Sequence, residues 1–250
     1  MNEFLKNNFA LLICIVLLMG FLNAFSQQNK TKVYLIHGQG SDSRLFSKIV
    51  INSAFDTICL NLPFPEKTDN MQSFALKLIP KIDTSQAFVL IGVSLGGMVA
   101  AELNEIIHPK QTILISSAKN RNELPKHYKF MRVFPIYKIF PAAFIKKSSY
   151  LMQPLVEPDR NKEKAIFKSM LRDKNKHFLK NSIPLIIKWS KKGNKGNEII
   201  HIHGSKDHTI PIKNVIAEIV IPNGSHMMTL TEASIISEKI NNILLNHSKE

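Results

Sequence analysis

The chain has 250 residues, enough for one sizeable domain with its own hydrophobic core. Hydrophobic residues are 44% of the sequence and charged residues 21%, which excludes a disordered, collagen-like or low-complexity chain. Two cysteines exclude a disulfide scaffold and a metal site made of cysteines alone, and the formal net charge of +14 calls for an explanation.

Residues 1–26 have the pattern of a signal peptide. The uncharged run 9–22 is shorter than the ~20 residues that a membrane-spanning helix needs. Ala24 and Ser26 supply the small residues of a cleavage site. We predict export to the periplasm or the cell exterior and a single mature domain over residues 27–250. The alternative is a chain anchored in the membrane by an uncleaved 9–22 segment.

Six short apolar runs, rich in β-branched residues, recur through the rest of the chain. They are continuous rather than alternating, as in parallel strands that are buried on both faces. Helical patterns separate several of the runs, so we predict an α/β fold with a mostly parallel six-stranded sheet flanked by helices. The predicted strands are Val33–Ile36, Thr57–Leu62, Phe88–Ile91, Thr112–Ile115, Ile199–Ile202 and Ile216–Ile221.

The alternation of strands and helices breaks over residues 119–195. We predict a helical cap here, inserted over the strand ends, with a helical piece at Glu163–Phe178 and a strand-like run at Ile183–Trp189. This segment holds 20 Lys/Arg and five Asp/Glu, whereas the rest of the chain holds 13 and 14. The positive charge therefore belongs to the cap. Trp189 is expected to pack in the core, although a position lining a pocket stays open.

The sequence Gly92-Val93-Ser94-Leu95-Gly96-Gly97 lies directly between a predicted strand and a predicted helix. A serine on so sharp a turn has a strained backbone, and the glycines two residues before and after it remove collisions with its neighbours. Such a turn exposes the serine hydroxyl at the N-terminus of a helix, where negative charge is favoured. Ser94 is therefore a candidate nucleophile, supported by Gly92 and Gly96.

The run His37-Gly38-Gln39-Gly40 follows the first predicted strand. Taken alone, it is a plain glycine turn with a structural histidine. Beside the serine turn, we interpret it as a loop that directs backbone N–H groups toward a developing oxyanion. The expected donors are the N–H groups of Gln39 and Leu95, with His37, Gly38 and Gly40 supporting the turn.

A serine needs a base to become a nucleophile, and the base needs an orienting acid. Asp207 and His226 each follow a predicted strand, on the edge where Ser94 lies. In this order the three residues resemble those of the α/β-hydrolase fold superfamily, and residues 32–118 and 196–246 are similar to its small serine esterases. The resemblance implies Ser94 as nucleophile, His226 as general base and Asp207 as the orienting acid.

The resemblance implies hydrolysis of a carboxylic ester or thioester through an acyl-enzyme, with no cofactor and no metal. Acyl transfer and C–C bond hydrolysis use the same three residues and stay open. A different class also stays open, namely a binding or envelope protein that uses the basic cap to hold an anionic partner. His201 and His203 would share a strand face, but the nearby carboxylate, Asp207, is better used by His226 than by a metal.

The basic cap has three interpretations. The first is a solvated lysine-rich face, the second is a surface that attracts an anionic or lipid-like substrate, and the third is a surface that docks on an anionic membrane. Aromatic residues between the charges, among them Tyr128 and Phe134, suit a headgroup interface. Nucleic acid is a poor partner for an exported chain that has no recognition motif. Outside the cap, Cys59 is expected to be a buried, inert thiol.

Overall fold

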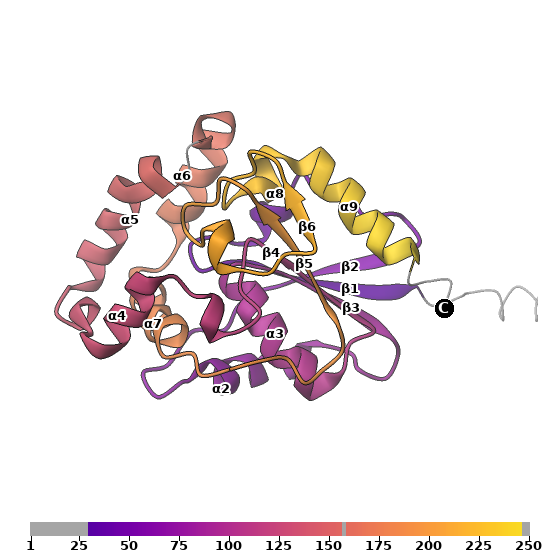
Figure 1. The fold of residues 1–250 in the computed structure, drawn as a ribbon, viewed down its shortest axis with the longest axis horizontal. Helices are drawn as coiled ribbons and strands as arrows, with labels where there is room; N and C mark the ends of the chain where they lie inside the picture. Colours follow the sequence, from indigo (N-terminus) through magenta and orange to yellow (C-terminus); the bar gives the residue numbers. More distant parts are fainter. Residues whose placement is uncertain (1–29, 157–158, 247–250) are drawn as a thin grey trace, which may run out of the picture. The chain divides into compact units, whose positions relative to one another are not determined.

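A sheet of six parallel strands is the centre of the structure, a computed structural model that describes residues 30–156 and 159–246. The strand order is β2-β1-β3-β4-β5-β6 (Figure 1). The predicted α/β sheet is confirmed, with all its neighbouring strands parallel. The strands are β1 Thr31–Ile36, β2 Phe55–Leu60, β3 Phe88–Val93, β4 Gln111–Ile115, β5 Ile199–Gly204 and β6 Ile219–Ile221. The predicted signal segment lies outside the described residues.

Helices cover both faces of the sheet. Helices α2 (Met71–Leu76) and α3 (Leu95–Ile107) lie below it in Figure 1, and α8 (Met228–Thr231) and α9 (Ala233–Asn246) lie above it. Side chains of β1 and β3 alternate between two buried apolar clusters, one on each face. This double burial explains why the central strands have continuous apolar sequences.

The cap follows β4 and returns the chain to β5. Its helices are α4 (Lys126–Val133), α5 (Ala142–Val156), α6 (Lys164–Asp173) and α7 (Lys176–Ile187), grouped at the left of Figure 1. Short 3-10 helices complete the described elements: η1 Ser43–Phe46, η2 Ile79–Lys81, η3 Arg121–Glu123, η4 Ile136–Lys138, η5 Arg160–Glu163 and η6 Ile212–Asn214.

The strand-like interpretation of Ile183–Trp189 is wrong, because most of that run is the last part of α7. Asn175 begins this helix by accepting hydrogen bonds from the backbone N–H groups of His177 and Phe178. Its buried residues recur at helical spacing through Leu179, Ser182, Leu185 and Ile186. The predicted helical piece Glu163–Phe178 is two helices, because α6 ends at Asp173 and Asn175 begins α7.

Two expectations about single residues have opposite outcomes. Trp189 packs in the core, as predicted, with 1% of its surface exposed, and its Nε1 donates to Glu102 Oε1 at 2.6 Å. Cys59, expected to be buried, is exposed. The physical reason is that β2 is an edge strand, and only Leu60 of its residues is fully buried.

Within the residues that the structure describes, no helix is both long enough and apolar enough to span a membrane.

Candidate active site

Ser94 lies on the turn between β3 and α3. Its φ of 53° falls in the left-handed region, a strained conformation for a residue with a side chain. A Cβ on Gly92 would collide with the Gly96 carbonyl, and one on Gly96 would collide with the carbonyls of Ile36 and His37. The glycines that the sequence analysis selected therefore make this turn sterically possible.

Neighbouring strand β4 holds the strained turn in place. The Ser94 N–H donates to the Ile115 carbonyl at 3.1 Å, and Ser117 Oγ donates to the Ser94 carbonyl at 2.7 Å. Both backbone polar groups of the serine are thus bonded to residues at the end of β4, and its side chain is left to make other contacts.

The structure brings Ser94, Asp207 and His226 together at the carboxyl edge of the sheet. Ser94 Oγ is 2.9 Å from His226 Nε2, and His226 Nδ1 is 2.8 Å from Asp207 Oδ2. With Nδ1–H donating to the carboxylate, Nε2 is the acceptor that faces the serine hydroxyl. The three side chains are in the order that proton transfer from the serine to the histidine requires.

Asp207 is prepared to stay ionised. Its other oxygen, Oδ1, accepts hydrogen bonds from the N–H groups of Thr209 and Ile210, each at 2.8 Å. Burial disfavours the charged carboxylate, but His226, His203 and the Ile210 N–H together outweigh it, so the Asp207 pKa lies below its usual range. A carboxylate in this state stabilises positive charge on the imidazole of His226.

His201 and His203 are buried beside one another on β5, behind Asp207. His203 Nδ1 is 3.0 Å from His201 Nε2, and His203 Nε2 donates to the Ile210 carbonyl at 2.7 Å. Burial lowers the pKa of His201 to about 3. Within residues 30–156 and 159–246, no group of three or more His, Cys, Asp and Glu side chains could hold a metal ion.

The predicted oxyanion run 37–40, which together with Ser41 we call the oxyanion loop, is organised around the carbonyl of Gly38. His37 Nδ1 donates to this carbonyl at 2.9 Å and Ser41 Oγ donates to it at 3.3 Å. Burial lowers the pKa of His37 to about 4, so the ring is neutral at pH 7. Because the C=O and N–H of a trans peptide point in opposite directions, these bonds also fix the direction of the Gln39 N–H.

The two glycines of the oxyanion loop differ in what they do. A Cβ on Gly38 would lie 3.2 Å from Ser94 Cβ, so the glycine allows the loop to lie directly beside the serine. A Cβ on Gly40 would meet nothing within 4 Å. The predicted supporting role therefore has a steric basis at Gly38, whereas the structure shows none at Gly40.

The side chain of Gln39 contacts the cap, a role that the sequence analysis did not assign. Its Nε2 donates to the Leu179 carbonyl at 3.0 Å and to Ser182 Oγ at 2.8 Å, both in α7. Gln39 thus follows Gly38, which lies beside the serine, while its own side chain is bonded to the cap. No local sequence signal indicates this contact, because the partners are 140 and 143 residues away.

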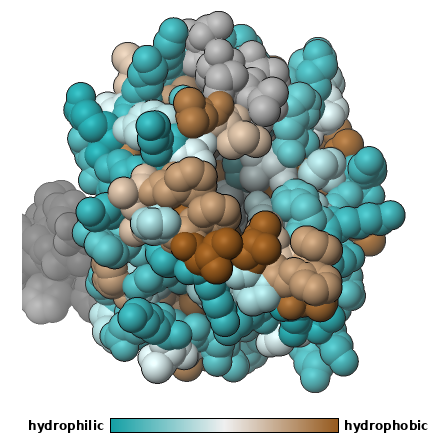
Figure 2. Space-filling view, turned by 90° about the vertical axis from the view of Figure 1, so that its left-hand side faces the viewer, coloured by the Kyte–Doolittle hydropathy of each residue, from teal (hydrophilic) through white to brown (hydrophobic). Residues whose placement is uncertain are grey.

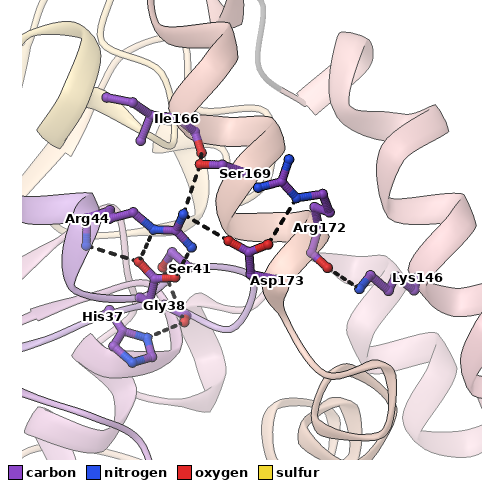
Figure 3. A network of polar contacts seen from close by, with 10 residues as sticks. His37, Gly38, Ser41, Arg44, Lys146, Ile166, Ser169, Arg172 and Asp173 are labelled. Carbon is purple, nitrogen blue, oxygen red and sulfur yellow. Dashed lines mark hydrogen bonds and ion pairs between the residues drawn. The ribbon is translucent and has the colours of Figure 1, made fainter.

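Arg44 connects the segment that follows the oxyanion loop to the cap (Figure 3). Its guanidinium donates to both carboxylate oxygens of Asp42, at 2.9 and 2.6 Å. It also contacts two residues of α6, Ser169 Oγ at 3.1 Å and Asp173 Oδ2 at 3.0 Å. One side chain thus joins the segment that follows the loop to a cap helix.

A cavity of about 200 Å³ opens beside Ser94 and His226. The oxyanion loop forms one wall, and every cap helix from α4 to α7 contributes side chains to it. Among its described lining residues, none is Lys, Arg, Asp or Glu. Nine of its nineteen described lining residues have large apolar side chains: Leu45, Val93, Met98, Phe167, Met170, Leu171, Ile186, Ile210 and Met227.

Tyr128 is a cavity residue that the sequence analysis placed only among the aromatics of the cap. It belongs to α4 and packs against the core cluster below the cap. Burial, together with the negative charge of Asp207, raises its pKa to about 12, so the phenol is neutral at pH 7. Its hydroxyl is a neutral polar group among apolar side chains.

No family model and no curated protein matches this chain. Similar solved structures include a putative aryl esterase from Burkholderia cenocepacia, with a TM-score of 0.67 and 14% identity over 89% of this chain and 92% of that one. Another is the enol-lactonase from Burkholderia xenovorans LB400, with a TM-score of 0.65 and 11% identity over 90% and 94%. A lipase-esterase related protein from Clostridium acetobutylicum ATCC 824 gives 0.62 and 13% over 86% and 95%.

These similarities extend over nearly the whole of each matched chain, so they concern the complete sheet and its helices and not a local motif. At such low identity they establish the fold and leave the reaction open, since the names of the similar proteins differ in substrate. Together with the strand order and the serine turn between β3 and α3, they show that this chain has the α/β-hydrolase fold.

Proposed function

We propose that this protein is an exported serine hydrolase that cleaves a carboxylic ester or thioester through an acyl-enzyme intermediate. The observation that carries the proposal is the continuous contact from Ser94 Oγ to His226 Nε2 and from His226 Nδ1 to Asp207 Oδ2. Such a chain of contacts activates a serine hydroxyl that is otherwise a weak nucleophile.

Acylation begins when Ser94 Oγ attacks the carbonyl carbon of the substrate and His226 Nε2 accepts the hydroxyl proton. Asp207 stabilises the imidazolium that forms. His226 then donates the proton to the departing alkoxide or thiolate, which leaves as an alcohol or thiol. A water molecule, deprotonated by His226, attacks the acyl-enzyme and releases the carboxylic acid with Ser94 restored.

The backbone N–H groups of Gln39 and Leu95 are proposed to bind the oxyanion. Leu95 is the first residue of α3, and the first N–H groups of a helix have no partner within it. Among the described residues, the Gln39 N–H makes no hydrogen bond to another protein group. A donor of this kind typically contributes about 10²–10³-fold to the rate of acyl transfer.

The cavity favours a neutral, apolar acyl group. Its charge-free lining would give no counter-charge to an anionic acyl chain, and burying an unpaired charge is costly. The lysines of the cap therefore lie outside the space where we place the acyl group. Esters, thioesters and lactones of apolar acids are the substrates to test first, in a series of increasing chain length.

Labelling with a fluorophosphonate tests the proposal. Ser94 Oγ would attack phosphorus and displace fluoride, leaving a phosphonyl-serine that mass spectrometry can assign to one peptide. We expect an adduct at Ser94 in the wild type, and none in the Ser94→Ala or His226→Ala variants. The remaining serines of the chain are the internal control for non-specific reaction.

Folded wild-type protein without an adduct would overturn the hydrolase proposal and favour the binding-protein alternative. An adduct that persists in His226→Ala would overturn the assignment of the base. The export part of the proposal has a separate test, since cleavage after Ser26 predicts a mature chain that begins at Gln27. The mass of the mature N-terminal peptide distinguishes this chain from an uncleaved one.

A further inference from the structure

The outward face of the cap exposes an unusual number of large apolar side chains. Phe130, Val133, Phe134, Ile139, Phe144 and Leu151 are each between 50% and 76% exposed. We call these six residues the outer cap surface. Figure 2 shows this side of the molecule, with hydrophobic residues gathered near its centre and hydrophilic ones around them. Large exposed apolar areas on soluble proteins usually mark a binding surface.

The two helices that carry most of this surface are divided along their length. On α4, Phe130 and Val133 share an exposed face with Lys126 and Lys129, at helical spacing, while Tyr128 lines the cavity. Helix α4 therefore has an inner face toward the cavity and an outer face that combines apolar and cationic side chains.

Helix α5 repeats the arrangement. Phe144, Lys147 and Leu151 are exposed and recur at positions i, i+3 and i+7, so they lie on one face. Ser149, on the other side of the helix, lines the cavity. An apolar stripe with lysines beside it is the pattern of a helix that lies in the headgroup region of a membrane.

The segment that carries the outer cap surface has charges of one sign. Residues 124–156 contain six Lys/Arg and no Asp or Glu. None of these six side chains forms an ion pair with a described carboxylate. Two copies of the chain that met through this surface would bring like charges together, which disfavours a dimer. An anionic lipid surface complements both the charges and the apolar side chains.

We propose that the outer cap surface docks on a membrane that contains anionic phospholipid, with its aromatic and aliphatic side chains in the headgroup region. The cavity would then lie directly behind the docked helices, because α4 and α5 contribute to both. Docking needs neither Ser94 nor His226, so it is independent of the proposed hydrolysis.

The test uses a local probe, since the apolar run 9–22 of the full chain can itself attach to vesicles. Phe134→Trp places an indole on the outer cap surface, and Val50→Trp places one on an exposed residue outside the cap. The buried Trp189 is a constant background in both variants. Vesicles are made of phosphatidylglycerol and phosphatidylcholine in equal parts, or of phosphatidylcholine alone, with and without brominated acyl chains.

We expect a blue shift and bromine quenching for Phe134→Trp with the anionic vesicles, no change for Val50→Trp, and loss of the response in high salt. The response should persist when Ser94→Ala is added. Equal responses of the two probes, no response of either, or an equal response to neutral vesicles would each overturn the proposal. A blue shift that grows with protein concentration without vesicles would overturn it in favour of self-association.

Charge reversal gives a second measurement. Each lysine near an anionic surface strengthens binding about fivefold, so Lys147→Glu should weaken vesicle binding of the Phe134→Trp protein by about 25-fold. Lys110→Glu is the matched control, because Lys110 is exposed just before β4, at the sheet edge away from the cap. Equal effects of the two substitutions would show that net charge, and not the outer cap surface, controls binding.

Discussion

The carboxyl edge of the sheet, called the sheet edge below, and the cap differ in their exposure to solvent. At the sheet edge, Asp207 and His226 are almost fully buried, and each makes hydrogen bonds that determine its orientation. On the cap, Val133 and Ile139 are more than two-thirds exposed, and the lysines of residues 124–156 have no carboxylate partner among the described residues. The polar groups of the first region are bonded to one another, whereas the second region presents apolar and cationic side chains to solvent.

This difference gives the two regions separate tasks in our proposals. The sheet edge contains Ser94, Asp207 and His226, the groups proposed to move protons and stabilise charge. The cap contributes apolar lining to the cavity and carries the outer cap surface, so we propose that it controls what reaches the serine. Gln39 and Arg44 join the two regions. Gln39 belongs to the oxyanion loop and donates to α7, and Arg44 contacts both Asp42, the residue after that loop, and Asp173 of α6.

The largest expected effect concerns the sheet edge. Ser94→Ala removes the nucleophile, and we expect kcat for an aryl ester to fall about 10⁴-fold or more with the thermal midpoint nearly unchanged. His226→Ala should give a loss of similar size, because residues that act as one unit are not additive. Steady-state kinetics with differential scanning fluorimetry checks both. A double variant much slower than either single variant would contradict the proposed unit.

The next effect separates sterically required glycines from permissive ones. Gly96→Ala places a methyl group against the carbonyls of Ile36 and His37, so we expect a loss of about 3 kcal/mol in the free energy of unfolding. Gly40→Ala is the control, since its methyl group meets nothing within 4 Å, and we expect a change within about 0.5 kcal/mol. Urea titrations of both variants measure the difference. Equal losses would contradict the steric argument for the serine turn.

The sheet could be predicted because its constraints are local and repetitive. Apolar runs buried on both faces indicate parallel strands, and Gly92 and Gly96 indicate a tight turn with no room for a Cβ at either position. Asp207 and His226 could be paired with Ser94 because parallel strands bring their carboxyl ends to the same edge. Strand ends therefore indicated that these residues meet, and the resemblance to the α/β-hydrolase fold supplied their expected roles.

The cap could be predicted only as a segment. Its helices have no sheet to determine their direction, and a short apolar run such as Ile183–Trp189 fits a strand as well as a buried helix. The contacts of Gln39 and Arg44 join residues more than a hundred positions apart, and nothing near either residue in the sequence indicates them. The prediction that Cys59 is buried failed for a related reason. Strand β2 is the outermost strand of the sheet, and the order of the strands cannot be deduced from the β2 sequence itself.

A smaller effect is expected on the pH dependence of the free energy of unfolding, and it tests the role of His37. Its pKa of about 4 in the folded chain lies below the ordinary value of 6.5. Between these values the unfolded chain binds the proton and the folded chain does not, so stability falls as the pH falls from 6.5 to 4. The expected contribution of His37 to this loss is about 3 kcal/mol.

His37→Gln should remove that part of the pH dependence, because glutamine does not titrate and its amide can still donate to the Gly38 carbonyl. Urea titrations at pH 6.5, 5 and 4 measure it. His177→Gln, at an exposed position of α7, is the matched control. An unchanged pH dependence in His37→Gln would show that the buried imidazole is not responsible, and His201, also buried with a lowered pKa, would be substituted next.

The smallest expected effect concerns the connection between the two regions. Arg44→Met removes the contacts to Asp42, Ser169 and Asp173 together. The guanidinium is partly exposed, so we expect only about 1 kcal/mol of lost stability. We expect a fall of about tenfold in kcat/KM, because small displacements at a reacting centre are costly in rate.

Two further variants separate the halves of this connection (Figure 3). Asp173→Asn weakens the contact to the cap but leaves the Arg44 contacts with Asp42, so its loss in kcat/KM should be smaller than that of Arg44→Met. Arg172→Met is the control, because the Arg172 side chain also pairs with Asp173 and, among the interactions of the described residues, makes no hydrogen bond or ion pair with Asp42. If Arg44→Met behaves like this control, the cap does not position the oxyanion loop through Arg44. The hydrogen bonds from Gln39 to α7 would then be the connection to test next.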